Sequence, residues 1–113
     1  MSNLTHLLDL AGLEAALAES LERPVILFKH SRNCGVSCEA LDELHAHAEA
    51  APPGAAYKII TVQSHRQLAN EVTVRLGIRH ETPQAILLRN GQPVWSASHF
   101  RITARQLDAI LQS

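Results

Sequence analysis

The chain has 113 residues, 46% of them hydrophobic, and its 10 Lys and Arg residues against 11 Asp and Glu residues give a formal net charge of −1. This length predicts one domain over residues 1–113 with its own core, and the balanced charge excludes strong attraction to nucleic acid or an anionic membrane. Residues 1–21 lack the basic start of an export signal and no apolar run reaches membrane-spanning length, so we expect a cytoplasmic protein without membrane or nucleic-acid partners.

The first segments predict a helix followed by a buried strand. Residues 4–7 could add a short strand at a sheet edge. Asp9 is a plausible N-cap, and leucines at spacings of three and four over Leu10–Leu21 mark one face of a helix that Pro24 ends. Val25–Lys29 opens with a continuous apolar run, which indicates a strand covered on both faces by helices.

A second helix and a second strand follow. The helix is expected to begin near Cys34 and to run toward Ala51, where Pro52-Pro53-Gly54 stops it. Its expected buried face consists of residues at helical spacing: Cys38, Leu41, Leu44 and Ala48. The β-branched and aromatic residues of Tyr57–Val62 predict the strand.

A capping pattern and a glycine delimit a third helix. Ser64 with Gln67 matches a capping box at its start, and Gly77 is expected to end it. The apolar face between them consists of Leu68, Val72 and Leu76. Strand, helix, strand and helix thus alternate, which predicts a parallel crossover unit with right-handed connections.

The last third of the chain predicts a hairpin and a closing helix. Asn90-Gly91 between Ala85–Leu88 and Pro93–Ala97 is a strong signal for a tight turn between antiparallel strands. Thr103 with Gln106 forms a second capping box. The apolar face of the closing helix consists of Ile102, Leu107, Ile110 and Leu111.

This element order predicts an α/β fold, with a mixed four-stranded sheet flanked by helices, a terminal β-hairpin and a C-terminal helix. That arrangement is thioredoxin-like. In such a fold a cysteine that follows the first core strand lies near a cis-proline that precedes the hairpin. Cys34 and the Thr82-Pro83 pair occupy these two places in the sequence.

Cys34 is expected where a buried strand is followed by a helix. The unpaired N–H groups and partial positive charge of a helix start stabilise a thiolate, which is the nucleophile in disulfide exchange. Free cysteines are often buried core residues, but the polar loop with Arg32, Gly35 and Ser37 favours an exposed thiol. A cytoplasmic protein also keeps its thiols reduced, so a structural disulfide is not expected.

Several segments resemble the YtxJ family of monothiol bacilliredoxins. They are residues 25–31 and 80–88, followed by Asn90-Gly91, 94–95 and 97–100. The resemblance implies a bacterial cytosolic protein that removes bacillithiol from S-bacillithiolated client proteins. The cysteine would attack the mixed disulfide, and a further bacillithiol or a partner reductase would regenerate the thiol. It implies no bound cofactor, only bacillithiol as a thiol co-substrate.

Two departures from the family, whose active site typically reads Thr-Cys-Pro-Ile-Ser, bear on the chemistry of Cys34. Asn33-Cys34-Gly35-Val36-Ser37 has glycine in place of proline, which should loosen the helix start. Cys38 adds a second cysteine one helical turn after Cys34, within the range that a disulfide bridges. Cys38 is therefore either a resolving cysteine or a small core residue.

Substrate-binding candidates lie in the two loops. A cis bond before Pro83 would expose the backbone of Thr82 to an extended thiol peptide. Beside Cys34, the candidates for substrate contact are Arg32, Asn33 and Gly35. Bacillithiol carries two malate carboxylates, so nearby cations would help to bind it. The candidates are Lys29, Arg32, Arg79 and, ranked first, His80.

Two other interpretations remain open, and a third is weaker. In one, Cys34 and Cys38 form an internal disulfide in a dithiol reductase with broader substrates. In another, the domain is a noncatalytic adaptor or redox sensor. The third is a metal site at His30, Cys34 and Cys38, but structural zinc normally has four ligands and no fourth is evident, so we predict no metal. Trp95 and Phe100 are interpreted as core or rim aromatics.

Overall fold

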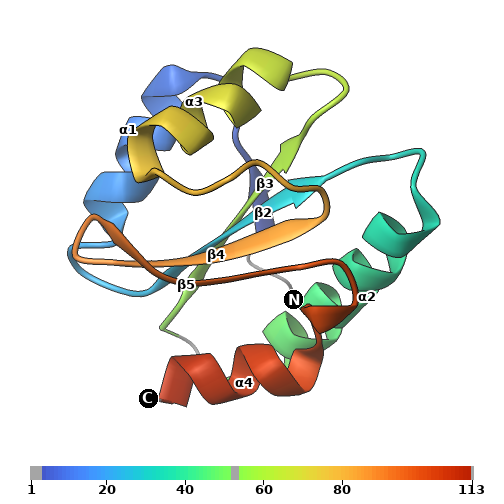
Figure 1. Ribbon diagram of the computed structural model, residues 1–113. Helices are drawn as coiled ribbons and strands as arrows, with labels where there is room; N and C mark the ends of the chain where they lie inside the picture. Colours follow the sequence, from blue (N-terminus) through green and yellow to red (C-terminus); the bar gives the residue numbers. More distant parts are fainter. Residues whose placement is uncertain (1–3, 52–53, 113) are drawn as a thin grey trace.

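The computed structural model describes residues 4–51 and 54–112 (Figure 1). They form a mixed sheet of five strands in the order β1-β3-β2-β4-β5. The strands are β1 (Leu4–His6), β2 (Val25–His30), β3 (Ala56–Thr61), β4 (Gln84–Arg89) and β5 (Gln92–Ser98). β3 pairs in parallel with β1 and β2, whereas β4 is antiparallel to both β2 and β5. The expected thioredoxin-like sheet is confirmed, but it has five strands rather than four because residues 4–6 form the edge strand.

Helices cover both faces of the sheet. They are α1 (Leu10–Glu19), α2 (Gly35–Ala50), α3 (Arg66–Leu76) and α4 (Ala104–Gln112), and a 3₁₀ turn, η1 (His99–Arg101), precedes α4. α1 and α3 lie on one face, and α2 and α4 lie on the other (Figure 1). Pro52 and Pro53, expected to stop α2, lie outside the described residues. Within the described ranges, no helix is both long and apolar enough to cross a bilayer.

β2 is the central strand, and all six of its residues are buried. Because side chains alternate along a strand, Val25 and Leu27 pack into the core beneath α1 and α3. Ile26 and Phe28 pack into the second core beneath α2 and α4. The expected strand with two covered faces is confirmed, and Lys29 continues the series that faces α3.

The capping predictions are confirmed at two helices and wrong at a third. The side chains of Asp9 and Thr103 accept hydrogen bonds from backbone N–H groups three residues later, at 2.8 and 3.1 Å. Gly77 ends α3 in the left-handed conformation, with φ of 67°. At the start of α3, however, the N-cap residue is His65. The Ser64 hydroxyl lies 2.8 Å from His65 Nδ1 instead of capping the helix.

The hairpin between β4 and β5 is held to the end of α1. Asn90 and Gly91 have φ values of 56° and 76°, as a tight two-residue turn requires. Their backbone N–H groups donate to the Ser20 carbonyl at 2.7 Å and to Ser20 Oγ at 2.8 Å. The predicted turn is confirmed, and it fixes one end of the sheet.

The two edge strands are irregular. Within the described part of the chain, β1 spans three residues. In β5, Pro93 has no backbone N–H to donate, and the pairing of β5 with β4 shifts register between Leu87 and Leu88. Neither edge is therefore a long regular row of backbone donors and acceptors.

The buried face of α2 differs from the expected one. Its fully buried residues are Ser37, Ala40, Leu44 and His47. Of the predicted face, Leu44 is fully buried, and Leu41 and Ala48 are partly buried and pack against the second core. The prediction counted polar residues as outward-facing, but two inward positions are polar. Cys38 is exposed, which excludes its interpretation as a core residue.

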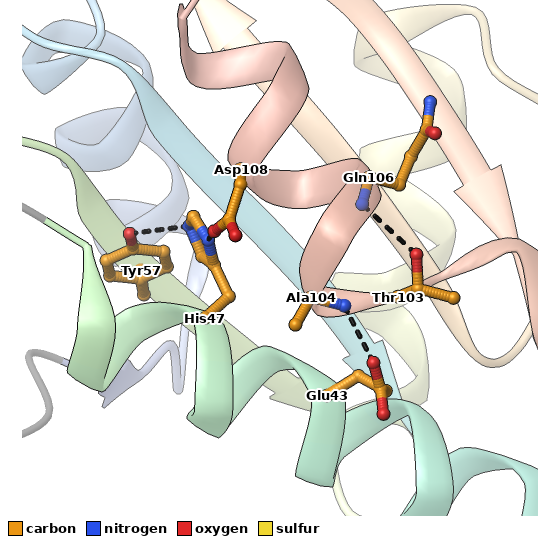
Figure 2. A network of polar contacts seen from close by, with 7 residues as sticks. All are labelled: Glu43, His47, Tyr57, Thr103, Ala104, Gln106 and Asp108. Carbon is orange, nitrogen blue, oxygen red and sulfur yellow. Dashed lines mark hydrogen bonds and ion pairs between the residues drawn. The ribbon is translucent and has the colours of Figure 1, made fainter.

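His47, which is buried, joins three elements on this face through a partly buried polar network (Figure 2). Burial and the nearby Asp108 carboxylate raise the pKa of Tyr57, so its phenol stays protonated and donates to His47 Nε2 at 2.9 Å. His47 Nδ1 pairs with the Asp108 carboxylate of α4. The Glu43 carboxylate accepts a hydrogen bond of 2.7 Å from Ala104 N, so α2 also caps the start of α4.

Candidate active site

Cys34 is the N-cap residue of α2 and follows the loop that leaves β2. Its N–H donates to the Ser31 carbonyl at 3.4 Å, and its own carbonyl accepts from Cys38 N at 3.1 Å. The residue is partly exposed, and its sulfur is free. A reachable thiol thus lies at the positive end of a helix, as the sequence predicted.

The buried side chain of Ser37 supports the loop that carries Cys34. The Ser37 side chain is fully buried, although its neighbourhood was interpreted as an exposed polar loop. Its hydroxyl accepts from Ser31 N at 2.9 Å and lies 2.8 Å from His30 Nδ1. Burial lowers the pKa of His30, with smaller contributions from His6 and Arg32, so the ring is neutral and can accept the Ser37 hydrogen.

Gln63 supports the same loop from the segment between β3 and α3. Its side-chain oxygen accepts from Arg32 N at 3.1 Å, and its side-chain nitrogen donates to Ser31 Oγ at 2.7 Å. Ser37 and Gln63 therefore hold Ser31 and Arg32, which lie in the loop between β2 and Cys34. Sequence reasoning missed both supports. Ser37 belongs to the segment that was compared with the family motif, so the motif could have indicated it. No feature of the sequence indicated a role for Gln63.

The second loop approaches the same end of the sheet. The peptide bond between Thr82 and Pro83 is cis, as predicted. Lys29 pairs with Gln84 in the antiparallel ladder of β2 and β4, so Pro83, which precedes Gln84, lies beside the end of β2 that leads to Cys34. We call Thr82-Pro83 the proline bend.

η1 connects the proline bend with the start of α2. The Pro83 carbonyl accepts a hydrogen bond of 3.1 Å from His99 N. His99 and Phe100 also line a surface groove of about 320 Å³ together with Val36, which lies in the first turn of α2. Phe100 is 71% exposed, so its interpretation as a packed aromatic is wrong. η1 therefore contacts the proline bend through His99 N and shares a groove with the first turn of the helix that carries Cys34.

Not all of the proposed cations are exposed, positively charged side chains. Lys29 is fully buried and cannot touch a free ligand. Burial, then Lys29 and Arg66, lower the pKa of His80, opposed by Glu81, so the imidazole is neutral near neutral pH. The two remaining candidates, Arg32 and Arg79, are exposed. His80 is therefore a neutral hydrogen-bonding group, not the leading cation.

Asn33 and Gly35 flank Cys34 on the surface, and Gly35 is the first residue of α2. Apart from Gly35 itself, its two chain neighbours and the adjacent helix backbone, no described atom lies within 4 Å of the position that a Cβ on Gly35 would occupy. Cys34 already has φ of −116° and ψ of 119°, the backbone region that a residue before proline prefers.

These features predict that Gly35→Pro raises the free energy of unfolding by about 0.4–1 kcal/mol, because proline suits the first helical position and restricts the unfolded chain. Urea denaturation of the reduced protein measures the change. Gly35→Ala is the matched control, since it adds a side chain without fixing φ. A proline variant less stable than the alanine variant would contradict the prediction.

Within the described residues, no three His, Cys, Asp or Glu side chains are placed to share a metal ion. His30, part of the metal pattern considered above, points its Nδ1 at Ser37 instead.

The sheet, its two helical layers and the cis-proline beside the end of β2 define a thioredoxin fold. A candidate oxidoreductase with a thioredoxin fold is 26% identical, with a TM-score of 0.86, and the match covers 98% of this chain and 95% of that one. A mutant thioredoxin from Halobacterium salinarum is 17% identical, with a TM-score of 0.77 and coverages of 99% and 92%. Fasciola hepatica thioredoxin is 18% identical, with a TM-score of 0.74 and coverages of 99% and 97%.

The chain can also be assigned to a protein family, which is a smaller group than all proteins with this fold. Residues 5–107 match the family described as monothiol bacilliredoxin BrxC. The chain belongs to this family, which confirms the resemblance noted in the sequence.

Proposed function

We propose that the chain is a thiol–disulfide oxidoreductase that removes bacillithiol from S-bacillithiolated proteins. The observation that carries the proposal is a partly exposed thiol, Cys34, at the N-terminus of α2, at the end of the sheet that also holds Pro83. Membership of the bacilliredoxin family supports bacillithiol as the thiol and the cytoplasm as the compartment. No bound cofactor is needed, because the electrons come from thiols.

The reaction consists of two exchanges. The Cys34 thiolate attacks the bacillithiol sulfur of the mixed disulfide, and the client leaves as a thiolate that takes a proton from solvent. A second bacillithiol thiolate then attacks the sulfur bound to Cys34. This releases the Cys34 thiolate and forms bacillithiol disulfide, which a partner reductase would reduce.

The surrounding residues would bind the two halves of the substrate. An extended client segment would pair with the backbone of Thr82 at the proline bend. Arg32, with Arg79 from the neighbouring loop, would attract the malate carboxylates of bacillithiol. Asn33 and Gly35, which border the thiol, would contact the bound mixed disulfide.

Cys38 supports a second candidate function. It is exposed and lies one helical turn beyond Cys34, so it could attack the Cys34 mixed disulfide and release bacillithiol without a second external thiol. The protein would then act as a dithiol reductase.

The direct test uses a client protein that carries bacillithiol on one cysteine. The expected result is that catalytic amounts of the protein, with free bacillithiol present, accelerate recovery of the client thiol, followed by intact mass. The same client carrying glutathione is the control for the choice of thiol. Recovery no faster than with free bacillithiol alone would refute the proposal.

A further inference from the structure

Lys29 is a charged residue in the core of the protein. Its side chain has 0% relative exposure, and a lysine is almost never buried in this way unless it is paired. Among the described residues, no carboxylate forms an ion pair with it. Its Nζ instead lies 3.4 Å from Thr73 Oγ1 on α3 and 3.2 Å from His80 Nδ1. Neither the fold nor the proposed exchange accounts for this lysine.

Lys29 begins a chain of hydrogen bonds in which the donor and the acceptor of each bond are fixed. A lysine ammonium only donates, so His80 Nδ1 must accept and the ring hydrogen must be on Nε2. His80 Nε2 lies 3.3 Å from Thr82 Oγ1, which therefore accepts the hydrogen bond. The Thr82 hydroxyl then has its own hydrogen left for another partner.

This chain ends at the proline bend. Thr82 is the residue immediately before Pro83, and Pro83 lies beside the end of β2 that leads to Cys34. Lys29 itself is in β2. A buried group in the central strand is thus connected through His80 to the residue that the proposed function assigns to substrate binding.

We propose that Lys29 is a positioning residue that fixes His80 as the neutral Nε2–H tautomer, so that the Thr82 hydroxyl directs its hydrogen toward a substrate held at the proline bend. This inference rests on the proposed function. It makes His80 a neutral orienting group whose role depends on which ring nitrogen carries the hydrogen. No proton is transferred along the chain.

Charged groups from three segments of the chain influence the protonation of His80. Lys29 from β2 and Arg66 from α3 disfavour a charged imidazole, and Glu81 in the same loop favours it. Among the described residues, two side chains lie within hydrogen-bond distance of the ring nitrogens, Lys29 at Nδ1 and Thr82 at Nε2. Removing the Lys29 ammonium should therefore change both the tautomer and the titration of His80.

The first test is nuclear magnetic resonance of the ring nitrogens of His80 in protein labelled with ¹⁵N-histidine. We expect the Nε2–H tautomer and a depressed pKa in the unmodified protein. In Lys29→Met, which keeps an unbranched buried side chain, we expect mixed tautomers and a pKa closer to about 6.5. An Nδ1–H tautomer in the unmodified protein, or a titration unchanged in Lys29→Met, would overturn the inference.

The second test uses kcat/KM for a bacillithiolated client. Lys29→Met and His80→Leu should each lower it by about two- to tenfold, the range for one lost hydrogen bond, and the double variant should be no slower than either. His80→Gln should retain most activity, because an amide also accepts at one atom and donates from the other. Additive losses, or equal losses in His80→Leu and His80→Gln, would refute the positioning role.

The two tests separate this inference from the proposed function. If the unmodified protein does not reduce bacillithiol mixed disulfides, the proposed function fails, and the tautomer measurement still decides whether Lys29 orients His80. If the protein is active but His80 behaves identically in Lys29→Met, only the positioning role fails.

Discussion

Cys34→Ala lowers the rate of client thiol recovery by at least about 10³-fold, because it removes the sulfur that forms the covalent intermediate. The protein should remain folded, since Cys34 is a partly exposed N-cap residue without a side-chain capping bond. Quenched assays with a bacillithiolated client and intact mass detection measure the loss, and circular dichroism verifies the fold.

Cys38→Ala is the matched control, because it removes an exposed thiol one turn away. A monothiol enzyme keeps its rate in this variant when free bacillithiol is present. A dithiol enzyme instead accumulates bacillithiol on Cys34 and slows. Full activity in Cys34→Ala would eliminate Cys34 as the nucleophile in either mechanism.

Lys29→Met should increase the free energy of unfolding at pH 7 by about 1–3 kcal/mol, because methionine fills the buried site without a charge. Burial lowers the pKa of Lys29 from 10.5 to about 8 in the folded protein. Between these two values the unfolded chain binds more protons, so the stability of the unmodified protein rises with pH in this window. The penalty is fully present below pH 8 and disappears above pH 10.5.

Urea denaturation from about pH 6 to pH 10.5 measures this difference across the window. The advantage of Lys29→Met should shrink as the pH rises through the window. Lys58→Met is the matched control: Lys58 is partly exposed and pairs with Glu19 at 3.1 Å, so its replacement should bring no gain at pH 7. A Lys29→Met variant that is less stable at pH 7, or an advantage that does not vary with pH, would contradict the prediction.

Local signals in the sequence predicted much of the fold. Asp9, Gly77 and the Asn90-Gly91 turn each act through their own backbone or through a residue a few positions away. The apolar run that opens Val25–His30 predicted a strand with two covered faces in the same way. These features depend on conformational preference and periodicity, which are properties of short segments.

The polar contacts of the Cys34 loop and of α2 were harder to predict because the partners lie in other elements, which only the fold brings together. Ser37 and His47 are polar yet face inward, and each is satisfied by hydrogen bonds that only the folded chain provides. The prediction treated the polar residues of α2 as solvent-facing, so the predicted buried face is rotated relative to the observed one. Gln63 contacts Arg32 across 31 positions, and nothing in its own surroundings marks it. His80 was ranked first among the cations from its place in the second loop, and nothing in the sequence indicated its contact with Lys29.

The irregular edges of the sheet have a consequence for how the protein meets other extended chains. A three-residue strand on one side and a proline-containing, register-shifted strand on the other are poor templates for recruiting a further strand. Copies of the protein should thus resist edge-to-edge aggregation, even at high concentration. The main-chain pairing with an extended client that we propose would instead use the partly exposed segment at Thr82.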